Sequence, residues 1–317
     1  GVTASSVYEA RLGVELFKKP VHGYSVGLSN SDCYAMNQLC NALSFNSLAQ
    51  MALFNTILPD SNISKGLRIN PMISSVSTPL YNPCAPYSRL GIPIDTLDPS
   101  ICNTINGLHF HALCEQNVDA LFPVLDAIEI YFSNHLHALD WINWGGGHHI
   151  TRDDYDCDAL IERINYWQNK YDLTVILEPG EAIGLHCGYY VTRVLDIVHN
   201  EMDIAICDIS ATAHMPDVLE YPYRPDIDGA FPVECAPYVY KIAGNTCLAG
   251  DIIGDYAFNA PLTVGQHLVF TDMGHYTLVK TTNFNGVNQP SVGIINRLDE
   301  ILLKRQSSYQ YFKEPLS

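Results

Sequence analysis

The sequence predicts an α/β fold, a (β/α)8-type barrel followed by a mostly-β domain, and two observations lead to this expectation. From about residue 20 to 185, short apolar runs that fit β-strands alternate with segments of helical periodicity, which is typical of a parallel sheet. After about residue 186 the apolar runs become short and β-rich, and glycine, proline and asparagine separate them. We therefore expect a barrel domain over residues 1–185 and a C-terminal β-rich domain over residues 186–317.

Five apolar runs are the expected strands of the barrel. They are residues 42–47, 65–70, 106–113, 138–146 and 173–180. Between them, residues 118–135 and 154–171 place apolar side chains at the i, i+3, i+4 and i+7 positions of a helix. Asp154 and Asp156 stand near the start of the second helix, where negative charge is favoured. Polar and glycine-rich residues follow the strand ends, so the active site is expected at the carboxyl edge of the barrel.

The second domain is expected to consist mainly of short strands. The runs that predict them are residues 190–199, 203–210, 266–273 and 276–284. The last stretch, residues 294–312, has helical spacing at first and then becomes polar, so it predicts a helix at its beginning.

Composition narrows the class of protein. A formal net charge of −17 argues against a nucleic-acid-binding surface and suits a soluble protein that attracts small cations, although acidity that merely maintains solubility is the alternative. No run of about 18 apolar residues predicts a membrane span. The first residues, from Gly1, do not have the pattern of a signal peptide. The ten cysteines are irregularly spaced without a CxxC pair, so we expect reduced thiols in a cytoplasmic protein.

Two motifs at the ends of expected strands could carry chemistry. In GLHFHALCEQ (107–116), His109 and His111 lie on one side of the extended chain, where they can bind a metal or place one ring against a flat cofactor. A hydrogen-bonded core histidine is the third interpretation. WGGGHHI (144–150) has three consecutive glycines whose N–H groups can form a phosphate nest. His148 and His149 in that run are simply solvent-facing in the alternative interpretation.

Three further motifs involve an acid, a thiol and a tyrosine. LEPGEA (177–182) ends an apolar strand with Glu178, and a half-buried carboxylate there can hold a proton on a ring nitrogen, as in pyridoxal phosphate enzymes. An ordinary turn is the alternative. In the second domain, GNTCLAGD (244–251) carries Cys247 and Asp251, and DMGHYT (272–277) carries Tyr276. A buried thiol and a packing tyrosine are the alternatives for these loops.

In this order along the chain, HFHALCEQ, GGGHH, LEPGE, GNTCLAGD and DMGHYTLVKTTNFNG resemble the alanine-racemase-fold decarboxylases that use pyridoxal 5'-phosphate. That family includes ornithine, diaminopimelate and arginine decarboxylases. The runs GLRINP, TPLYNPCAPYSRLGI, WGGGHHITRDDYD and DISATAHMPDVLEYPYRP (208–225) resemble its branch that acts on carboxynorspermidine and carboxyspermidine. The resemblance implies a lyase of spermidine biosynthesis that releases CO₂ and forms norspermidine or spermidine. Another basic amino acid decarboxylase of the diaminopimelate or ornithine type is the alternative within the family.

The resemblance implies cofactor contacts at matching positions. His111 would stack on the cofactor ring, and Glu178 would pair with the pyridine nitrogen. Cys114 stands where many relatives have a phosphate-binding serine. The phosphate would be held by Gly145, Gly146, Gly147 and Tyr276.

It also implies catalytic and substrate contacts that cross between subunits. Cys247 would donate a proton from the partner subunit of a homodimer, since active sites of the family are shared across the dimer interface. Asp251 lies in the same loop and would approach the substrate amine. The substrate would be a small polycationic amino acid, for which Asp208, Asp217 and Glu220 are further candidate contacts.

Two residues depart from the family pattern. Glu181 replaces a phosphate-binding arginine of many relatives, a change that the carboxynorspermidine branch shares. Leu248 replaces an acidic residue that ornithine and diaminopimelate enzymes carry after the cysteine.

The resemblance also implies a lysine that forms a Schiff base with the cofactor, on a first strand tens of residues before the segment that here begins at Ala4. Lys18, Lys19 and Lys65 follow that segment, so we assign no catalytic lysine. We expect the first barrel strand to be missing from this chain, which leaves two edges unpaired, and the chain alone to be inactive. An incomplete amino terminus is the expected reason. A first segment on another chain and a degenerate, non-enzymatic homologue are the alternatives.

A metal-dependent barrel hydrolase is the rival class. It would use His109, His111, His148 and His149 with an acid, and its His-x-His would lie on the first strand with an aspartate on the last. Here the His-x-His lies mid-barrel and the last strand offers Glu178 before Pro-Gly. We therefore assign no metal site.

Overall fold

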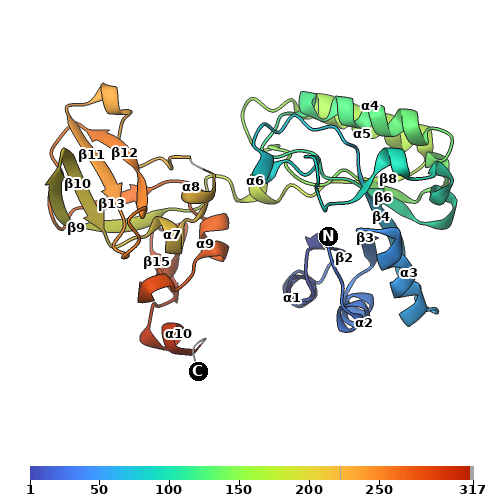
Figure 1. Ribbon diagram of the computed structural model, residues 1–317, viewed down its shortest axis with the longest axis horizontal. Helices are drawn as coiled ribbons and strands as arrows, with labels where there is room; N and C mark the ends of the chain where they lie inside the picture. Colours follow the sequence, from blue (N-terminus) through green and yellow to red (C-terminus); the bar gives the residue numbers. More distant parts are fainter. Residues whose placement is uncertain (222, 315–317) are drawn as a thin grey trace. The chain divides into compact units, whose positions relative to one another are not determined.

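The computed structural model describes residues 1–221 and 223–314 and divides the chain into two compact units, Gly1–Ile183 and Gly184–Ser317. In Figure 1 the first unit runs from blue to yellow-green along the chain. Pro222, which belongs to the run 208–225 quoted above, and residues 315–317 lie outside the described residues.

Seven parallel strands build the sheet of the first unit, and each pairs with the next along the chain. They are β1 (Val2–Ala4), β2 (Val21–Ser25), β3 (Ala42–Phe45), β4 (Ser64–Asn70), β6 (Gly107–His109), β7 (Trp141–Asn143) and β8 (Thr174–Ile176). The two-residue β5 (Ile92–Pro93) pairs with the end of β4. A closed (β/α)8 barrel has eight such strands, and β1 and β8 are the edges of this sheet among the described residues. The five predicted strands of this part are confirmed, four of them with shorter bounds.

Serine residues after β1, β2 and β3 explain why helices begin there. Ser6, Ser29 and Ser47 are the N-caps of α1 (Val7–Leu12), α2 (Asn30–Leu39) and α3 (Leu48–Ile57), and each hydroxyl accepts from a backbone N–H three residues on. Ser29 and Asp32 form a complete capping box. The apolar pattern alone did not predict these helices, although the Ser-x-x-Asp spacing of α2 is a signal that could have found it.

The two helices predicted from periodicity are present with shorter bounds. α4 covers Phe122–Phe132, and α5 covers Cys157–Tyr171 after Asp156, whose side chain accepts from the Ala159 N–H. The helices lie side by side in Figure 1, and Arg163 of α5 pairs with Asp126 of α4 at 3.1 Å. α6 (Gly180–Gly184) begins directly after the Glu178 turn.

Trp141 fills the interior of the sheet beneath the carboxyl edge. A Cβ on Gly66 or Gly107 would lie 2.2 or 2.1 Å from the indole, so these positions have room only for glycine. The indole N–H donates to Ser64 Oγ at 2.8 Å, and the His22 ring packs edge-on against the indole at 4.6 Å. This packed layer forms a floor, and polar side chains stand above it.

The second unit contains a five-stranded sheet with the order β12-β11-β10-β9-β13. Its strands are β9 (Tyr190–Asn200), β10 (Met202–Cys207), β11 (Tyr238–Ala243), β12 (Ile252–Phe258) and β13 (His267–Phe270). Three short helices accompany them, α7 (Ala211–His214), α8 (Asp217–Glu220) and α9 (Tyr276–Lys280). Its buried apolar residues form a core of their own around Val194, Ile242 and Phe270. The predicted fold class, a barrel-type α/β sheet and a mostly-β domain, is confirmed.

The strand predicted over residues 276–284 is wrong, because residues 276–280 form α9. The His275 imidazole accepts from the Tyr276 N–H at 3.0 Å and so caps the first turn. At the other end, the Lys280 ammonium pairs with Asp217 and Glu220 of α8. The aromatic and β-branched composition of the segment favours a strand, but these side-chain contacts stabilise a helix instead.

The helix predicted at the start of residues 294–312 is also wrong. The chain forms a hairpin of β14 (Val292–Ile295) and β15 (Ile301–Arg305), and the short α10 (Tyr309–Lys313) follows. The Asn296 side chain accepts from the N–H groups of Leu298 and Glu300, and Asp299 adopts a positive φ of 59°. Such an asparagine turn reverses the chain, so the apolar residues on either side pair as strands.

Two expectations from the sequence concern the whole chain: that it has no membrane span and that its cysteines are reduced. Across the described ranges, no helix combines the length and the hydrophobicity that a bilayer crossing requires. All ten cysteines are free thiols, and Cys114 is half-buried. The exposed ones are Cys157, Cys187, Cys235 and Cys247.

Candidate active site

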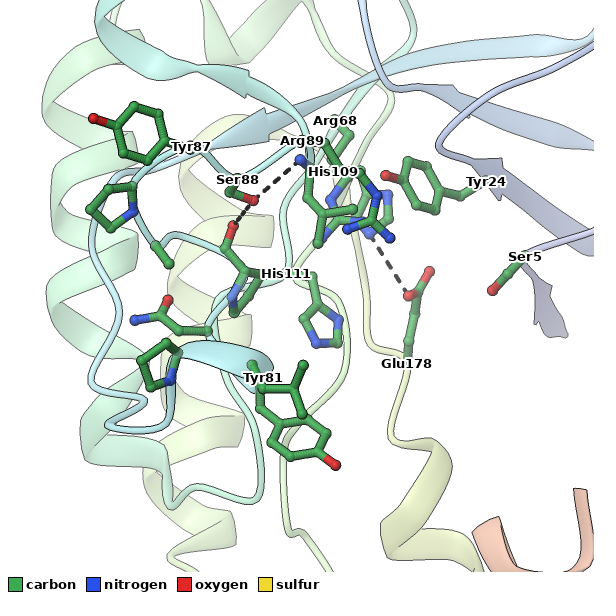
Figure 2. A pocket seen from close by; sticks show the side chains of 17 residues that line it. Ser5, Tyr24, Arg68, Tyr81, Tyr87, Ser88, Arg89, His109, His111 and Glu178 are labelled. Carbon is green, nitrogen blue, oxygen red and sulfur yellow. Dashed lines mark hydrogen bonds and ion pairs between the residues drawn. The ribbon is translucent and has the colours of Figure 1, made fainter. Parts of the chain in front are cut away.

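A cavity of about 590 Å³ opens at the carboxyl edge of the first unit (Figure 2). Its walls include Tyr24 of β2, Arg68 of β4, and His109 and His111 at and after β6. Glu178 closes one side after β8, and the loop of residues 79–90 covers the other. The cavity therefore lies where the sequence predicts an active site.

Glu178 is the acid of this cavity. Its Oε1 accepts a hydrogen bond from Asn143 Nδ2 at 2.7 Å, and its Oε2 lies 3.7 Å from His109 Nε2. The side chain is 16% exposed, and burial raises the pKa of its carboxyl, while the Asn143 hydrogen bond and the Arg68 charge oppose that rise. A positively charged N–H donor would stabilise the ionised carboxylate in these surroundings.

The three glycines after β7 allow the chain to pass through a narrow space. Gly145 and Gly147 have positive φ values of 71° and 81°, which favour glycine. A Cβ on Gly146 would lie 2.5 Å from the carbonyl oxygen of Glu178, and one on Gly147 would lie 2.3 Å from that of Leu113. The glycine run thus lets the chain pack between Glu178 and the segment of residues 110–114.

Hydrogen bonds already occupy two of the three glycine amides. Gly145 N–H donates to Asn143 Oδ1 at 2.8 Å, and Gly146 N–H donates to His111 Nδ1 at 3.1 Å. The Gly147 N–H donates to no acceptor among the described residues. Of the three, this amide is the one available to an anion, and the phosphate contacts of the glycines stay a prediction.

His111 presents a neutral ring to the cavity. Burial lowers the pKa of its imidazole to about 4, with further lowering by Arg68 and His148. Because Nδ1 accepts from Gly146, the proton of the neutral ring is assigned to Nε2. Figure 2 shows the ring on the cavity wall, and a flat neutral ring there suits stacking on a planar ligand.

Arg68, Tyr24 and His109 form a cluster on the cavity wall. The Arg68 guanidinium lies 4.6 Å from the centre of the Tyr24 ring, and that ring meets His109 edge-on at 5.4 Å. Burial and the Arg68 charge lower the pKa of His109 far below its usual range, so the ring is neutral. Reasoning from the sequence missed Arg68 and Tyr24. A charged residue inside the apolar run 65–70 is the signal that could have found Arg68.

The histidine-rich metal site of the hydrolase hypothesis is not assembled. Within the described part of the chain, the group with metal-ligand spacing is Glu115, His149 and Glu181, whose ligand atoms lie within 4.8 Å of one another. Neither His109 nor His111 belongs to it.

Cys114 lies beside this acidic group. Burial raises the pKa of its thiol to about 11, and the charges of Glu115 and Glu181 add to the rise. The thiol therefore stays protonated at neutral pH, and its predicted role as a phosphate ligand stays a prediction.

The remaining predicted residues lie in the second unit. Cys247 is exposed on the loop between β11 and β12, and Tyr276 begins α9 with half of its surface exposed. Asp208 accepts from Thr192 Oγ1 and from the Arg193 N–H, both at 2.7 Å. The first unit thus brings together its own predicted residues, which are His111, Cys114, Gly145, Gly146, Gly147 and Glu178.

Comparison with known proteins decides the class of this site. A sequence profile described as "Pyridoxal-dependent decarboxylase, C-terminal sheet domain" matches residues 7–274. The chain belongs to this family of pyridoxal-dependent decarboxylases. The decarboxylase is 42% identical over its whole length to carboxyaminopropylagmatine decarboxylase of Synechocystis, of which it covers 82%.

Two further comparisons point to the same branch. Over 98% of its length the decarboxylase is 39% identical to carboxynorspermidine/carboxyspermidine decarboxylase of Campylobacter jejuni, of which it covers 84%. It also matches the crystal structure of carboxynorspermidine decarboxylase from Campylobacter jejuni complexed with norspermidine. The TM-score is 0.90 at 38% identity, and the match covers 99% of this chain and 86% of that one. Polyamine precursors are therefore the substrate class.

The cavity of the decarboxylase fits pyridoxal phosphate. Arg68 is 6% exposed and His109 is 2% exposed, yet Arg68 Nε and both ring nitrogens of His109 have no hydrogen-bond partner among the described residues. Buried polar atoms are normally paired, so these groups suit a polar ligand. Glu178 could accept from the ring nitrogen, and the Gly147 amide could donate to an anionic oxygen.

Proposed function

We propose that the protein decarboxylates carboxynorspermidine or carboxyspermidine and so forms norspermidine or spermidine. The observation that carries this proposal is the half-buried carboxylate of Glu178 in the cavity of a chain whose fold and sequence resemble those of the norspermidine-bound Campylobacter jejuni enzyme. Carboxyaminopropylagmatine is a second candidate substrate, because carboxyaminopropylagmatine decarboxylase of Synechocystis is 42% identical to this protein over the whole chain.

Residues of the first unit would hold and polarise the cofactor. Pyridoxal phosphate, when bound, supplies an electron sink for the electron pair left by departing CO₂. Glu178 would keep the ring nitrogen protonated, and the neutral His111 ring would cover one face. The Trp141 floor and the cluster of Arg68, Tyr24 and His109 would help to exclude water from the cavity.

Cys247 would return a proton to the substrate carbon after CO₂ leaves. Its exposed position on a loop suits delivery into the active site of a partner subunit, and we propose a homodimer with shared active sites on this basis. In the second unit, Asp208 bonds Arg193 and Thr192, and Asp217 and Glu220 pair with Lys280. Contacts of these acids with substrate ammonium groups therefore require rearrangement of those bonds.

Lysines of the first unit lie outside the cavity wall. Lys65 Nζ bonds Asn55 Oδ1 at 2.7 Å near the amino end of β4, and Lys170 of α5 pairs with Glu129 of α4 at 2.7 Å. Among the described residues the cationic side chains that line the cavity are Arg68 and Arg89. We therefore assign the covalent attachment of the cofactor to none of these lysines.

The test is CO₂ release by the full-length gene product, supplied with pyridoxal phosphate, from carboxynorspermidine, carboxyspermidine, carboxyaminopropylagmatine, diaminopimelate and ornithine. The highest kcat/KM is expected for one of the first two. A clear preference for carboxyaminopropylagmatine would favour the second candidate. A preference for diaminopimelate or ornithine, or cofactor binding without CO₂ release from any compound, would overturn the proposal.

A further inference from the structure

The carboxylate of Asp251 is buried at the centre of the second unit's Cys247 loop. The residue is 3% exposed. Its Oδ1 accepts from the Ala211 N–H at 2.7 Å and from Ser210 Oγ at 3.1 Å, and its Oδ2 accepts from Thr246 Oγ1 at 2.5 Å. In the described ranges it has no basic ion-pair partner. A buried carboxylate without a counter-ion depends on such donors, so these bonds hold it firmly.

The loop of residues 244–251 closes around this carboxylate. Gly244 N–H donates to the Asp251 carbonyl at 2.8 Å, and Asp251 N–H donates to that of Leu248 at 3.0 Å. A Cβ on Gly244 would lie 2.4 Å from Asp251 Oδ2, so the chain passes directly over the acid. Cys247 lies at the exposed tip of this closed loop.

Helix α7 joins this loop to the segment that carries Tyr276. Ser210 caps α7, and its hydroxyl both accepts from the Ala213 N–H and bonds Asp251. The Ala213 carbonyl in turn accepts from the Thr282 N–H at 2.7 Å, two residues after α9 ends. One short helix thus touches both segments through hydrogen bonds on its two sides.

We propose that Asp251 is a positioning residue that fixes Cys247 relative to Tyr276 through α7. This inference rests on the proposed function, because that function gives Cys247 and Tyr276 their parts in catalysis. The Asp251 oxygens are already occupied by hydroxyl and amide donors of the protein, which suits a positioning role better than direct contact with a substrate ammonium group.

Amide hydrogen exchange of the purified protein tests the linkage without any cofactor or substrate. In Asp251→Asn one of the two acceptor oxygens becomes an NH2 donor, which opposes either the Ala211 N–H or the Thr246 N–H. We expect exchange in residues 244–251 and also in residues 276–284 to rise roughly tenfold, as befits loss of a hydrogen bond to a charged group. Residues 190–207 in β9 and β10 serve as the internal reference and should not change.

A second pair of variants guards against a global loss of folding. Thr246→Val removes the hydroxyl that bonds Asp251 and keeps the shape of the side chain, whereas Thr246→Ser keeps the hydroxyl. Faster exchange in both segments of Thr246→Val, and wild-type exchange in Thr246→Ser, would support the proposal. Unchanged exchange in residues 276–284 of both Asp251→Asn and Thr246→Val would overturn the link through α7.

Steady-state kinetics separates positioning from substrate binding. A positioning role predicts that Asp251→Asn lowers kcat and leaves KM within about twofold, because an interaction made only in the transition state is disturbed. A raised KM with unchanged kcat would instead assign Asp251 to the substrate amine and overturn the proposal. Failure of the proposed decarboxylation would leave the exchange result unaffected.

Discussion

The side-chain amide of Asn143 joins Glu178 to the glycine turn. Its Nδ2 donates to Glu178 Oε1 at 2.7 Å, and its Oδ1 accepts from the Gly145 N–H at 2.8 Å. Asn143 is fully buried, so one neutral group sets both the orientation of the acid and the path of the loop. Its amide can donate to a carboxylate, which an aspartate at this position could not do.

Asn143→Asp is expected to weaken cofactor binding. A second carboxylate within hydrogen-bond distance raises the pKa of Glu178 further, and the loss of one hydrogen bond to a charged group corresponds to roughly tenfold in affinity. Titration with pyridoxal phosphate, followed by absorbance, measures the change. Asn106→Asp is the matched control, because Asn106 makes the same pair of bonds, to Asp140 and to the Lys65 N–H. Equal affinity loss in both variants would contradict the specific role of Asn143.

Glu178→Gln is expected to lower kcat/KM by roughly 100-fold or more, the scale of a positioned proton-holding group. The ring nitrogen of the cofactor would lose the partner that keeps it protonated. Glu129→Gln serves as the control, since Glu129 is a half-buried acid that bonds Lys170, Tyr166 and Tyr171. Full activity of Glu178→Gln would argue against the whole cofactor assignment.

Gly146→Ala should lower both the melting temperature and cofactor affinity, because the new Cβ would lie 2.5 Å from the Glu178 carbonyl oxygen. Overpacking of this kind costs about 1–3 kcal/mol. Thermal melts with and without pyridoxal phosphate measure it. Gly180→Ala, two residues after Glu178, has no atom within 4 Å of the added Cβ and should melt like the wild type. Equal melting temperatures of the two variants would show that the close approach of Gly146 to the Glu178 carbonyl oxygen does not limit stability.

Cys247→Ala in the full-length enzyme is expected to slow protonation of the product carbon with little loss of cofactor. Product analysis in deuterated water and the kcat for CO₂ release measure this effect, and Cys235→Ala, another exposed thiol of the second unit, is the control. Mixing Cys247→Ala with Glu178→Gln should restore part of the activity if active sites are shared between subunits. Unchanged decarboxylation kinetics in Cys247→Ala would remove the residue from the mechanism.

Stability is expected to fall as the solution is acidified below about pH 6.5, the ordinary pKa of histidine. Burial lowers the pKa of His22 to about 4 in the folded protein. As the pH falls, His22 is therefore protonated in the unfolded chain before it is protonated in the folded one. The contribution of the neutral ring to the free energy of unfolding is lost between about pH 6.5 and 4. The full effect at this one residue is about 3 kcal/mol.

Denaturant unfolding across this pH range compares the wild type with His22→Asn, whose curve should be flatter. His199→Asn, which removes an exposed histidine, is the control and should parallel the wild type. Parallel curves for the wild type and His22→Asn would contradict a neutral, buried His22.

Local patterns were sufficient for much of the architecture. Apolar runs ending in polar residues predicted the strands that become β3, β4, β6, β7 and β8. Helical periodicity and an acidic start predicted α5, where Asp156 is the N-cap. These features depend on neighbours within one or two turns, so they can be read from a short window of sequence. The order of the motifs along the chain was enough to indicate the family.

Specific side-chain contacts that the apolar pattern does not encode decided the rest. Residues 276–280 became a helix because His275 caps them and α8 supplies acids for Lys280, and residues 292–305 became a hairpin around Asn296. In each case the apolar pattern was compatible with either structure.

The sequence by itself determined which chemical groups follow the strands: the acid of Glu178, the glycines after β7 and the thiol of Cys247. The tertiary structure alone decided that Asn143, 35 residues before Glu178, meets its carboxylate, and that Asp251 lies buried beneath the Cys247 loop. The physical reason is that the burial and hydrogen bonding of a polar group depend on side chains that only folding brings within about 3 Å, whereas propensity and periodicity act between near neighbours.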